Sequence, residues 1–165
     1  MEWYVVHTKV RQEGRALENL STQGYECYLP QIRRQKLSRG AIKLAFEPLF
    51  PRYLFIHLDD SLAGKSWSPI RSTPGVSSLV SFGGVPAKAP DIFIEHLRKQ
   101  VNVINEAPTK IHQPGERLLI TSGPFAGIEG IFELDDGESR AMLLIEILSK
   151  TTRINVPLAA LSRVA

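Results

Sequence analysis

Residues 138–150, ESRAMLLIEILSK, decide the fold of this chain, because they fit two different structures. A half-buried strand alternates apolar and polar side chains, but residues 141–145 form an unbroken apolar run, so a strand here would carry large apolar side chains on both faces. The same residues are good helix formers. In a helix, one apolar stripe would be formed by Met142, Leu144, Ile145 and Leu148.

The residues that flank this segment favour both structures. Asp135 and Asp136 precede it and suit the amino-terminal end of a helix, whereas residues 127–130 and the alternating residues 154–156 suit a small β-barrel. Local preference and the pattern of the surrounding module therefore conflict, and such conflicts tend to occur at functional sites. The alternative is a barrel strand whose apolar outer face packs against another part of the chain.

The segment belongs to a small carboxy-terminal module. Its other expected elements are a strand at 117–121, a turn-rich loop at 122–127, a second strand at 128–134 and a tight turn at 135–137. Before the module, residues 101–113 lack a clear period and contain Pro108, which is typical of a linker. We therefore expect a first domain at residues 1–104, a linker at 105–112 and a second domain at 113–165.

The first domain mixes strands and helices. Its strongest strand is YLFIHL at residues 53–58. The other expected elements are strands at 3–7, 25–29 and 76–82, a helix at 10–23 ended by Gly24, a loop or hairpin arm at 31–46, a loop at 70–74, and a helix at 92–100 with Asp91 as its N-cap.

The composition excludes several classes of protein. The chain has 165 residues, of which 43% are hydrophobic and 22% charged, an ordinary balance for a globular protein. No apolar run approaches the roughly 18 residues of a membrane span, and the first residues, MEWY, lack the basic start of a signal peptide. The single cysteine, Cys27, excludes an internal disulfide framework. We therefore expect a cytoplasmic protein.

No motif in the sequence points to catalysis, and we expect no enzymatic activity, no cofactor and no metal site. Cys27 has no histidine near it in the sequence. Gly83 and Gly84 are followed by valine and proline rather than by the lysine of a phosphate-binding loop. Metal-binding spacing is absent from the four histidines, His7, His57, His96 and His112.

Charge is distributed unevenly along the chain, whose net charge is +3. Residues 1–105 carry 14 basic and 9 acidic residues, a net charge of +5, whereas residues 106–165 carry 6 and 8, a net charge of −2. The densest basic stretch is 9–52. A basic first domain indicates a polyanionic partner, most often nucleic acid; the alternative is a solvated basic surface without a partner.

Four blocks of sequence together carry a family resemblance. They are WYVVHTK at 3–9, FEPLFPRYLFI at 46–56, IRSTPGV at 70–76 and PGERLLITSGPFAG at 114–127. They resemble a NusG-type transcription elongation factor, and they cover both halves of the chain in the family's order. The resemblance implies an α+β fold, with an amino-terminal NusG domain (an antiparallel sheet with flanking helices) and a carboxy-terminal KOW domain.

Within the family, the chain most resembles the specialised antitermination branch, RfaH, on its short length and on residues 47–55 and 137–144. This implies autoinhibition, in which the second domain is an α-helical hairpin that masks the polymerase-binding site of the first. It also implies fold switching, because the released domain refolds as a small β-barrel. The alternatives are a general NusG-like factor without fold switching, or a KOW-containing ribosome- or RNA-binding protein.

The resemblance also implies the partners and the function. The chain would act as a monomer that binds RNA polymerase and the single-stranded non-template DNA, and suppresses pausing and termination. On activation its second domain would contact a small-subunit ribosomal protein.

By resemblance, the polymerase site consists of His7, Tyr53, Phe55, Phe82, Ile94 and Leu97. The strand at 53–58 supports this in part, because alternation places its aromatic residues and His57 on one face and Leu54, Ile56 and Leu58 on the other. The aliphatic face is the better core, which leaves the aromatic face as the docking candidate. The alternative is that Tyr53 and Phe55 simply belong to the core.

In the closed state, the apolar stripe of 138–150 would cover this site. The residues expected between the domains are Glu47, Arg140, Met142, Ile145 and Leu148. Glu47 and Arg140 match an interdomain ion pair of RfaH, and we expect them to pair across the interface. If exposed, such a pair contributes only about 0–1 kcal/mol, which matters where two states are nearly balanced.

By the same resemblance, the DNA-binding residues are Lys9, Gln12, Arg15, Arg71 and Thr73. Arginine and lysine hold phosphates, while glutamine and threonine can reach base edges. Two departures from RfaH bear on the contacts. Pro74 stands where RfaH has an arginine, and Lys65, Ser66 and Trp67 stand in place of a His-Thr-Thr motif that touches the polymerase.

Overall fold

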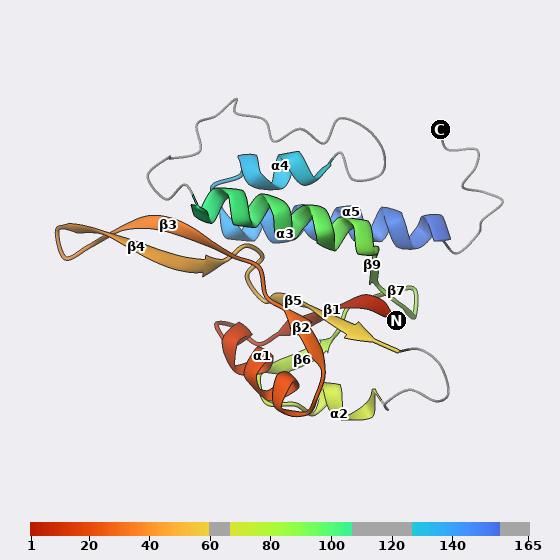
Figure 1. Ribbon diagram of the computed structural model, residues 1–165. Helices are drawn as coiled ribbons and strands as arrows, with labels where there is room; N and C mark the ends of the chain where they lie inside the picture. Colours follow the sequence, from red (N-terminus) through yellow and green to blue (C-terminus); the bar gives the residue numbers. More distant parts are fainter. Residues whose placement is uncertain (60–66, 107–126, 156–165) are drawn as a thin grey trace.

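The computed structural model describes residues 1–59, 67–106 and 127–155, which form an α+β structure around an antiparallel sheet (Figure 1). The strands lie in the order β2 (Glu26–Tyr28), β5 (Tyr53–Leu58), β1 (Glu2–Thr8) and β6 (Val76–Leu79), and β9 (Lys88–Ala89) also pairs with β1. The expected class, with its antiparallel sheet and flanking helices, is confirmed.

The centre of the sheet is formed by β1 and β5, whose middle residues are apolar and buried on both faces. Full burial, at 0% exposure, is found for Val5, Val6, Leu54, Phe55 and Ile56. The antiparallel register pairs Val5 with Phe55 and His7 with Tyr53. The bounds of β5 are those predicted from the sequence.

Helices cover both faces of the sheet (Figure 1). On one face lie α1 (Glu13–Thr22) and α2 (Ser68–Arg71). There the aliphatic side of β5 packs with Ala16 and Leu20 of α1. The prediction that Leu54, Ile56 and Leu58 belong to the core is therefore confirmed.

On the other face lie α3 (Asp91–Glu106) and α5 (Gly137–Asn155), and α4 (Gly127–Glu133) packs on them from the side away from the sheet (Figure 1). Residues of these helices share one hydrophobic cluster with the aromatic side of β5. The cluster includes Phe55, Phe93, Ile94, Leu97, Ile128, Ile131, Phe132, Ala141, Leu144 and Leu148. Residues 138–150 thus adopt the helical one of the two structures that their sequence fits.

Residues 31–48 form a hairpin arm, one of the two structures expected for this region. It consists of β3 (Gln31–Ser38) and β4 (Ala41–Pro48), joined at Arg39 and Gly40, which have φ angles of +52° and +77°. A smaller hairpin pairs β7 (Ser81–Phe82) with β8 (Val85–Pro86). Its turn, Gly83–Gly84, has positive φ at both positions, a conformation that glycine adopts without steric cost.

Two predictions for helical regions are wrong. The strand expected at 128–134 is helix α4, because Ile128, Ile131 and Phe132 are spaced for one helical face and are buried in the cluster with α5. The helix expected at 92–100 begins one residue earlier and continues to Glu106. Asp91 therefore lies in the first turn rather than at the N-cap.

Three smaller differences concern the ends of elements. The helix expected from residue 10 begins at Glu13, because Arg11, with φ at +61°, is outside the right-handed helical region. The loop expected at 70–74 begins inside the short helix α2. The strand expected at 76–82 is interrupted at Val80, where β6 ends and β7 begins.

The expected strand at 117–121 and all but the last residue of the loop at 122–127 lie outside the described residues. The same holds for residues 107–112 of the expected linker, whereas its first two residues belong to α3. The division into two domains stays a prediction.

Candidate functional site

The six residues expected to bind polymerase lie on or beside the face of the sheet that α3, α4 and α5 cover. Phe55, Ile94 and Leu97 are buried, at 0%, 2% and 0% exposure, in one cluster with residues of α4 and α5. His7 and Tyr53 are half-buried and stack with ring centres 5.1 Å apart. Phe82 is half-buried beside the same cluster.

An apolar groove of about 460 Å³ lies where this face meets α5. Tyr53 and Phe82 line it from the first domain. From α5 it is lined by Ala141, Met142, Ile145, Glu146 and Ser149. Tyr53 and Phe82, at the edge of the face, thus line a groove beside α5, while Phe55, Ile94 and Leu97 are enclosed.

The side of α5 that faces the sheet differs in part from the predicted stripe. Leu144 and Leu148 are fully buried, as expected, and Ile145 is half-buried. The prediction for Met142 as a covering residue is wrong, because its side chain is 74% exposed at the rim of the groove. Its place on the buried side is taken by Ala141 and by Ile147.

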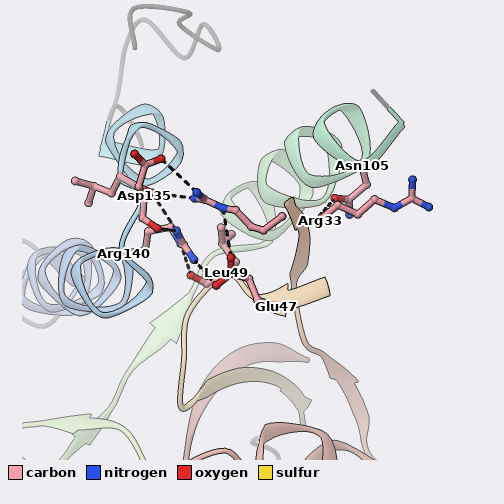
Figure 2. Close-up of polar contacts among 8 residues, drawn as sticks. Arg33, Glu47, Leu49, Asn105, Asp135 and Arg140 are labelled. Atoms are coloured by element: carbon pink, nitrogen blue, oxygen red, sulfur yellow. Dashed lines mark hydrogen bonds and ion pairs between the residues drawn. The ribbon is translucent and has the colours of Figure 1, made fainter. Parts of the chain in front are cut away.

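Arg140 fixes this orientation of α5 (Figure 2). Its side chain is fully buried, and its Nε donates to the backbone oxygen of Leu49 at 2.8 Å. Its Nη1 donates to the carbonyl oxygens of Leu134 at 3.0 Å and Asp135 at 2.9 Å. The same guanidinium therefore caps the carboxy-terminal end of α4 and connects α5 to the segment that follows β4.

The predicted contact between Glu47 and Arg140 is present, with Oε2 and Nη2 3.6 Å apart. Sequence reasoning treated it as an exposed pair, whereas Arg140 is enclosed and Glu47 is 23% exposed. Burial lowers the pKa of the Arg140 guanidinium, and the charge of Arg34 acts in the same direction, while Glu47 opposes both. The carbonyl contacts are shorter than the ion pair, so Arg140 is held chiefly by the backbone.

Arg34 makes a second contact between the hairpin arm and the carboxy-terminal helices, which sequence reasoning missed. Its Nε lies 3.4 Å from Glu47, and its Nη1 lies 3.2 Å from Asp135, in the connection between α4 and α5. Its Nη2 donates to the carbonyl oxygen of Leu134 at 3.4 Å. The only signal in the sequence was its place in a basic stretch, which does not identify a partner.

Asp136 caps α5. Its Oδ2 accepts hydrogen bonds from the hydroxyl of Ser139 at 2.8 Å and from the backbone N–H of Ser139 at 3.2 Å. These bonds, the hydroxyl bond first, lower the pKa of the Asp136 carboxyl. The expectation that the acids before 138–150 suit a helix start is confirmed here for Asp136.

Four of the five predicted DNA-binding residues lie at the end of the sheet where β1 stops. Lys9, Arg15 and Arg71 are exposed, and Gln12 is half-buried. The two segments that carry them meet where the backbone N–H of Lys9 donates to the carbonyl of Gly75 at 2.9 Å. We call Lys9, Gln12, Arg15 and Arg71 the basic patch.

The prediction that Thr73 reaches DNA bases is wrong. Thr73 is 3% exposed, and its hydroxyl donates to the carbonyl of Pro69 at 2.8 Å while accepting from the Gln23 amide at 2.7 Å. Its hydrogen bonds stabilise the turn before β6. The neighbouring Pro74 is exposed instead.

The loop that departs from the RfaH pattern is described only at Trp67, since Lys65 and Ser66 lie outside the described residues. Trp67 is half-buried, and its indole N–H donates to the carbonyl of Asp59 at 3.1 Å. Its ring meets that of Tyr4 edge-on at 4.8 Å. The tryptophan thus packs against the aliphatic side of the sheet.

Arg52 links the basic patch to the covered face, and sequence reasoning did not single it out. Its φ is +73°, its Nε donates to the carbonyl of Thr8 at 3.2 Å, and its backbone N–H donates to the buried carboxylate of Glu13 at 3.2 Å. Burial, and then the charge of Arg52, lower the pKa of His7. Arg52 therefore holds the end of β1 and the start of α1 in place.

Within the described ranges, no group of three or more histidine, cysteine, aspartate or glutamate side chains is arranged to hold a metal ion. Cys27 is half-buried, and burial, with the charge of Glu26 second, raises the pKa of its thiol to about 12. Among the helices of the described part, none has the length and apolarity that crossing a bilayer requires.

Comparison with known proteins gives a consistent result. Residues 1–98 match the family model described as "Transcription termination factor nusG". The protein of Deinococcus radiodurans named transcription termination/antitermination protein NusG is 27% identical over 188 aligned positions, which cover 99% of each chain. The protein of that name from Thermus thermophilus is 26% identical and covers 94% of this chain and 95% of its own.

A solved structure, described as "Domain interaction in Thermotoga maritima NusG", aligns with a TM-score of 0.41 at 20% identity. The alignment covers 70% of this chain and 62% of that one.

Proposed function

Because this chain belongs to the NusG family of transcription factors, we propose that it is an elongation and antitermination factor of the RfaH type, at rest in an autoinhibited state. A general NusG-like role in transcription elongation and antitermination follows from the family and from the names of the relatives. The further proposal is that α4 and α5 mask the polymerase-binding face, and that their release exposes it. The freed domain then refolds as a KOW-type barrel and contacts a small-subunit ribosomal protein.

The observation that carries this proposal is that the sheet and α3 share one hydrophobic cluster with α4 and α5. Phe55, Ile94 and Leu97, which the family resemblance assigns to polymerase binding, lie in one cluster with Leu144 and Leu148 of α5. A polymerase surface and α5 cannot both cover these side chains. Since truncation of one fully buried leucine costs about 2–5 kcal/mol, the packing of α5 is strong enough to decide which state is populated.

The arrangement of the basic patch supports the DNA part of the proposal. Lys9, Arg15 and Arg71 are exposed at one end of the sheet and lie outside the cluster that α5 covers. A shallow cationic surface of this kind suits a single strand better than a groove. In the proposed mechanism the patch meets the non-template strand while α5 still covers the polymerase face.

The test is a pull-down of RNA polymerase by the full chain. Leu144→Asp/Leu148→Asp introduces charge into the buried side of α5 without changing the first domain, and should increase the polymerase recovered by at least about tenfold. Met142→Asp is the control, because it adds one such charge at an exposed position of the same helix. It should behave like the wild type.

Two results would contradict the proposal. If the wild type and both variants recover polymerase equally and strongly, α5 does not mask the site, and the chain is a general NusG-like factor. Failure of the double variant to recover polymerase, in a preparation whose first domain remains folded by circular dichroism, would remove the assignment of this face to polymerase.

A further inference from the structure

The arm formed by β3 and β4 extends away from the sheet and helices (Figure 1). Its strands pair continuously from Gln31 opposite Pro48 to Ser38 opposite Ala41. Among the described residues, neither strand pairs with a further strand. The outer edge of such a hairpin can pair with another strand, because it carries a row of backbone N–H and C=O groups that the hairpin itself does not use.

The hydrogen bonds at the root of the arm show which backbone groups of β4 point outward. The backbone N–H of Arg33 donates to the side chain of Asn105 at 3.0 Å (Figure 2), and the carbonyl of Gln31 accepts from the same amide at 2.9 Å. Both groups therefore point away from β4. Residues directly opposite each other alternate between pairs that exchange backbone hydrogen bonds and pairs that do not. Phe46, opposite Arg33, and every second residue before it therefore direct their backbone groups outward.

The residues of β4 that direct their backbone outward are also its exposed apolar residues. Ile42, Leu44 and Phe46 alternate along the strand and so share a face, and their side chains are 70%, 52% and 54% exposed. Lys43 and Ala45 lie on the other face. The free backbone groups and the apolar row thus coincide, which suits this edge to pairing with a strand of matching pattern.

The sequence of β4 matches a second copy of itself. In an antiparallel pair centred on Leu44, that residue lies opposite Leu44 of the second copy, and Ile42 lies opposite Phe46. An aromatic and a β-branched residue form a favourable cross-strand pair. On the other face Lys43 lies opposite Ala45, so this register brings no two like charges directly opposite each other.

The edge of β3 lacks this self-complementarity. Arg33, Arg34 and Lys36 lie within four residues of it. Antiparallel registers centred on residues 33–36 all place two of these cations opposite each other, which is destabilising. Asn105 also occupies the backbone groups at the root of this edge. Charges protect an edge strand from pairing, whereas residues 41–46 of β4 carry only Lys43.

We infer that the outer edge of β4 is a self-association surface, at which two copies of the chain pair antiparallel about a two-fold axis at Leu44. The two arms then form one four-stranded ribbon, and the two sheets lie at its opposite ends. Such an edge buries far less than the roughly 1,200–2,000 Å² of a stable interface. We therefore expect a reversible dimer, with a dissociation constant of about 10–500 µM. This association is independent of the proposed function, and it replaces the monomer that the family resemblance implies.

The first test is the sedimentation of the full chain between about 10 and 1,000 µM. The wild type should change from monomer to dimer over this range. Leu44→Lys places two ammonium groups opposite each other at the axis, and should weaken the dimer by about fivefold or more. Ile92→Lys is the matched control, because Ile92 is 49% exposed at the start of α3, compared with 52% for Leu44. It should dimerise like the wild type.

The second test uses the alternation along β4. As the concentration of the wild type rises, amide hydrogen exchange should slow at Ile42, Leu44 and Phe46, whose N–H groups gain acceptors. Exchange at Lys43 and Ala45 should stay the same, because their N–H groups already point to β3.

Four results would overturn the inference. They are a wild type that stays monomeric up to about 1,000 µM, a dimer that Leu44→Lys leaves intact, equal losses in Leu44→Lys and Ile92→Lys, and equal slowing of exchange at all five residues of 42–46. Neither measurement uses polymerase or nucleic acid, so failure of the masking proposal does not affect them.

Discussion

The strongest contacts of Arg140 are its hydrogen bonds to backbone carbonyls. It is fully enclosed, and three carbonyl oxygens lie within 3.0 Å of its nitrogens. Glu47, the partner expected from the sequence, is more distant at 3.6 Å. The guanidinium fork reaches Leu49 on one side and the end of α4 on the other, which a single ammonium group cannot do.

Arg140→Lys should therefore destabilise the full chain even though the charge is kept. The expected loss is about 1–3 kcal/mol in the free energy of unfolding, because at least one buried carbonyl loses its donor. Arg140→Ala should cost more, at least about 3 kcal/mol, since all three carbonyls lose their donor. Urea unfolding followed by circular dichroism measures both values. Wild-type stability in Arg140→Lys would mean that charge alone matters at this position.

Gly137, the first residue of α5, touches the first domain so closely that a side chain does not fit. A Cβ there would lie 2.7 Å from Cγ of Pro51. Gly137→Ala should destabilise the closed state, with a lower urea midpoint and more polymerase recovered than by the wild type. Gly14→Ala in α1 is the control, because nothing lies within 4 Å of its Cβ position. It should be neutral or stabilising by up to about 1 kcal/mol. Equal effects of the two changes would argue against a tight contact at Gly137.

At the scale of elements, sequence reasoning predicted β5 with its observed bounds. Tyr53, Phe55 and Ile56 favour strands, and two aspartates follow the run directly. The end of α3 was missed for a physical reason. Val101 and Ile104 continue the apolar face of the helix, but the buried Gln100 interrupts the pattern before them. A buried polar side chain cannot be recognised from its own sequence position.

For α4 and α5 it was harder to predict whether the segment is a helix or a strand, and which side of the helix is buried. Residues 128–134 contain isoleucine and phenylalanine, which favour strands. The helical spacing of Ile128, Ile131 and Phe132 spans less than two turns, and it favours the helix because that face packs against α5. The predicted stripe on α5 is rotated away from the observed buried side, because it was chosen from apolar residues alone and the buried side includes Arg140. With Arg140 directed at Leu49, Met142 lies about 200° further round the helix and points to solvent.

The position of the arm depends on this extension of α3. Asn105 bonds the backbone of β3 through both ends of its amide. Asn105→Ala should leave the closed interface intact but loosen the root of the arm. Amide hydrogen exchange should become about tenfold or more faster at Arg33, while rates in β5 stay unchanged. Unchanged exchange at Arg33 would show that the arm is positioned without Asn105.

At the scale of the whole molecule, one sheet carries two surfaces with different accessibility. The basic patch and the arm are open at one end of the sheet, whereas the aromatic face shares its core with α4 and α5. Charge follows the same division, with a net charge of +5 on residues 1–105 and −2 on residues 106–165. The contact of Arg34 with Asp135 joins the two signs across the interface. This arrangement therefore leaves basic charge exposed while apolar surface is covered.

The proposed fold switch requires residues 137–150 to adopt different structures with and without the first domain. Backbone chemical shifts measured by NMR for the full chain and for residues 110–165 alone decide it most directly. We expect helical Cα shifts across 137–150 in the full chain and strand-like shifts in the isolated module. Helical shifts in both samples, or strand-like shifts in both, would contradict a helix that persists only while it covers the first domain.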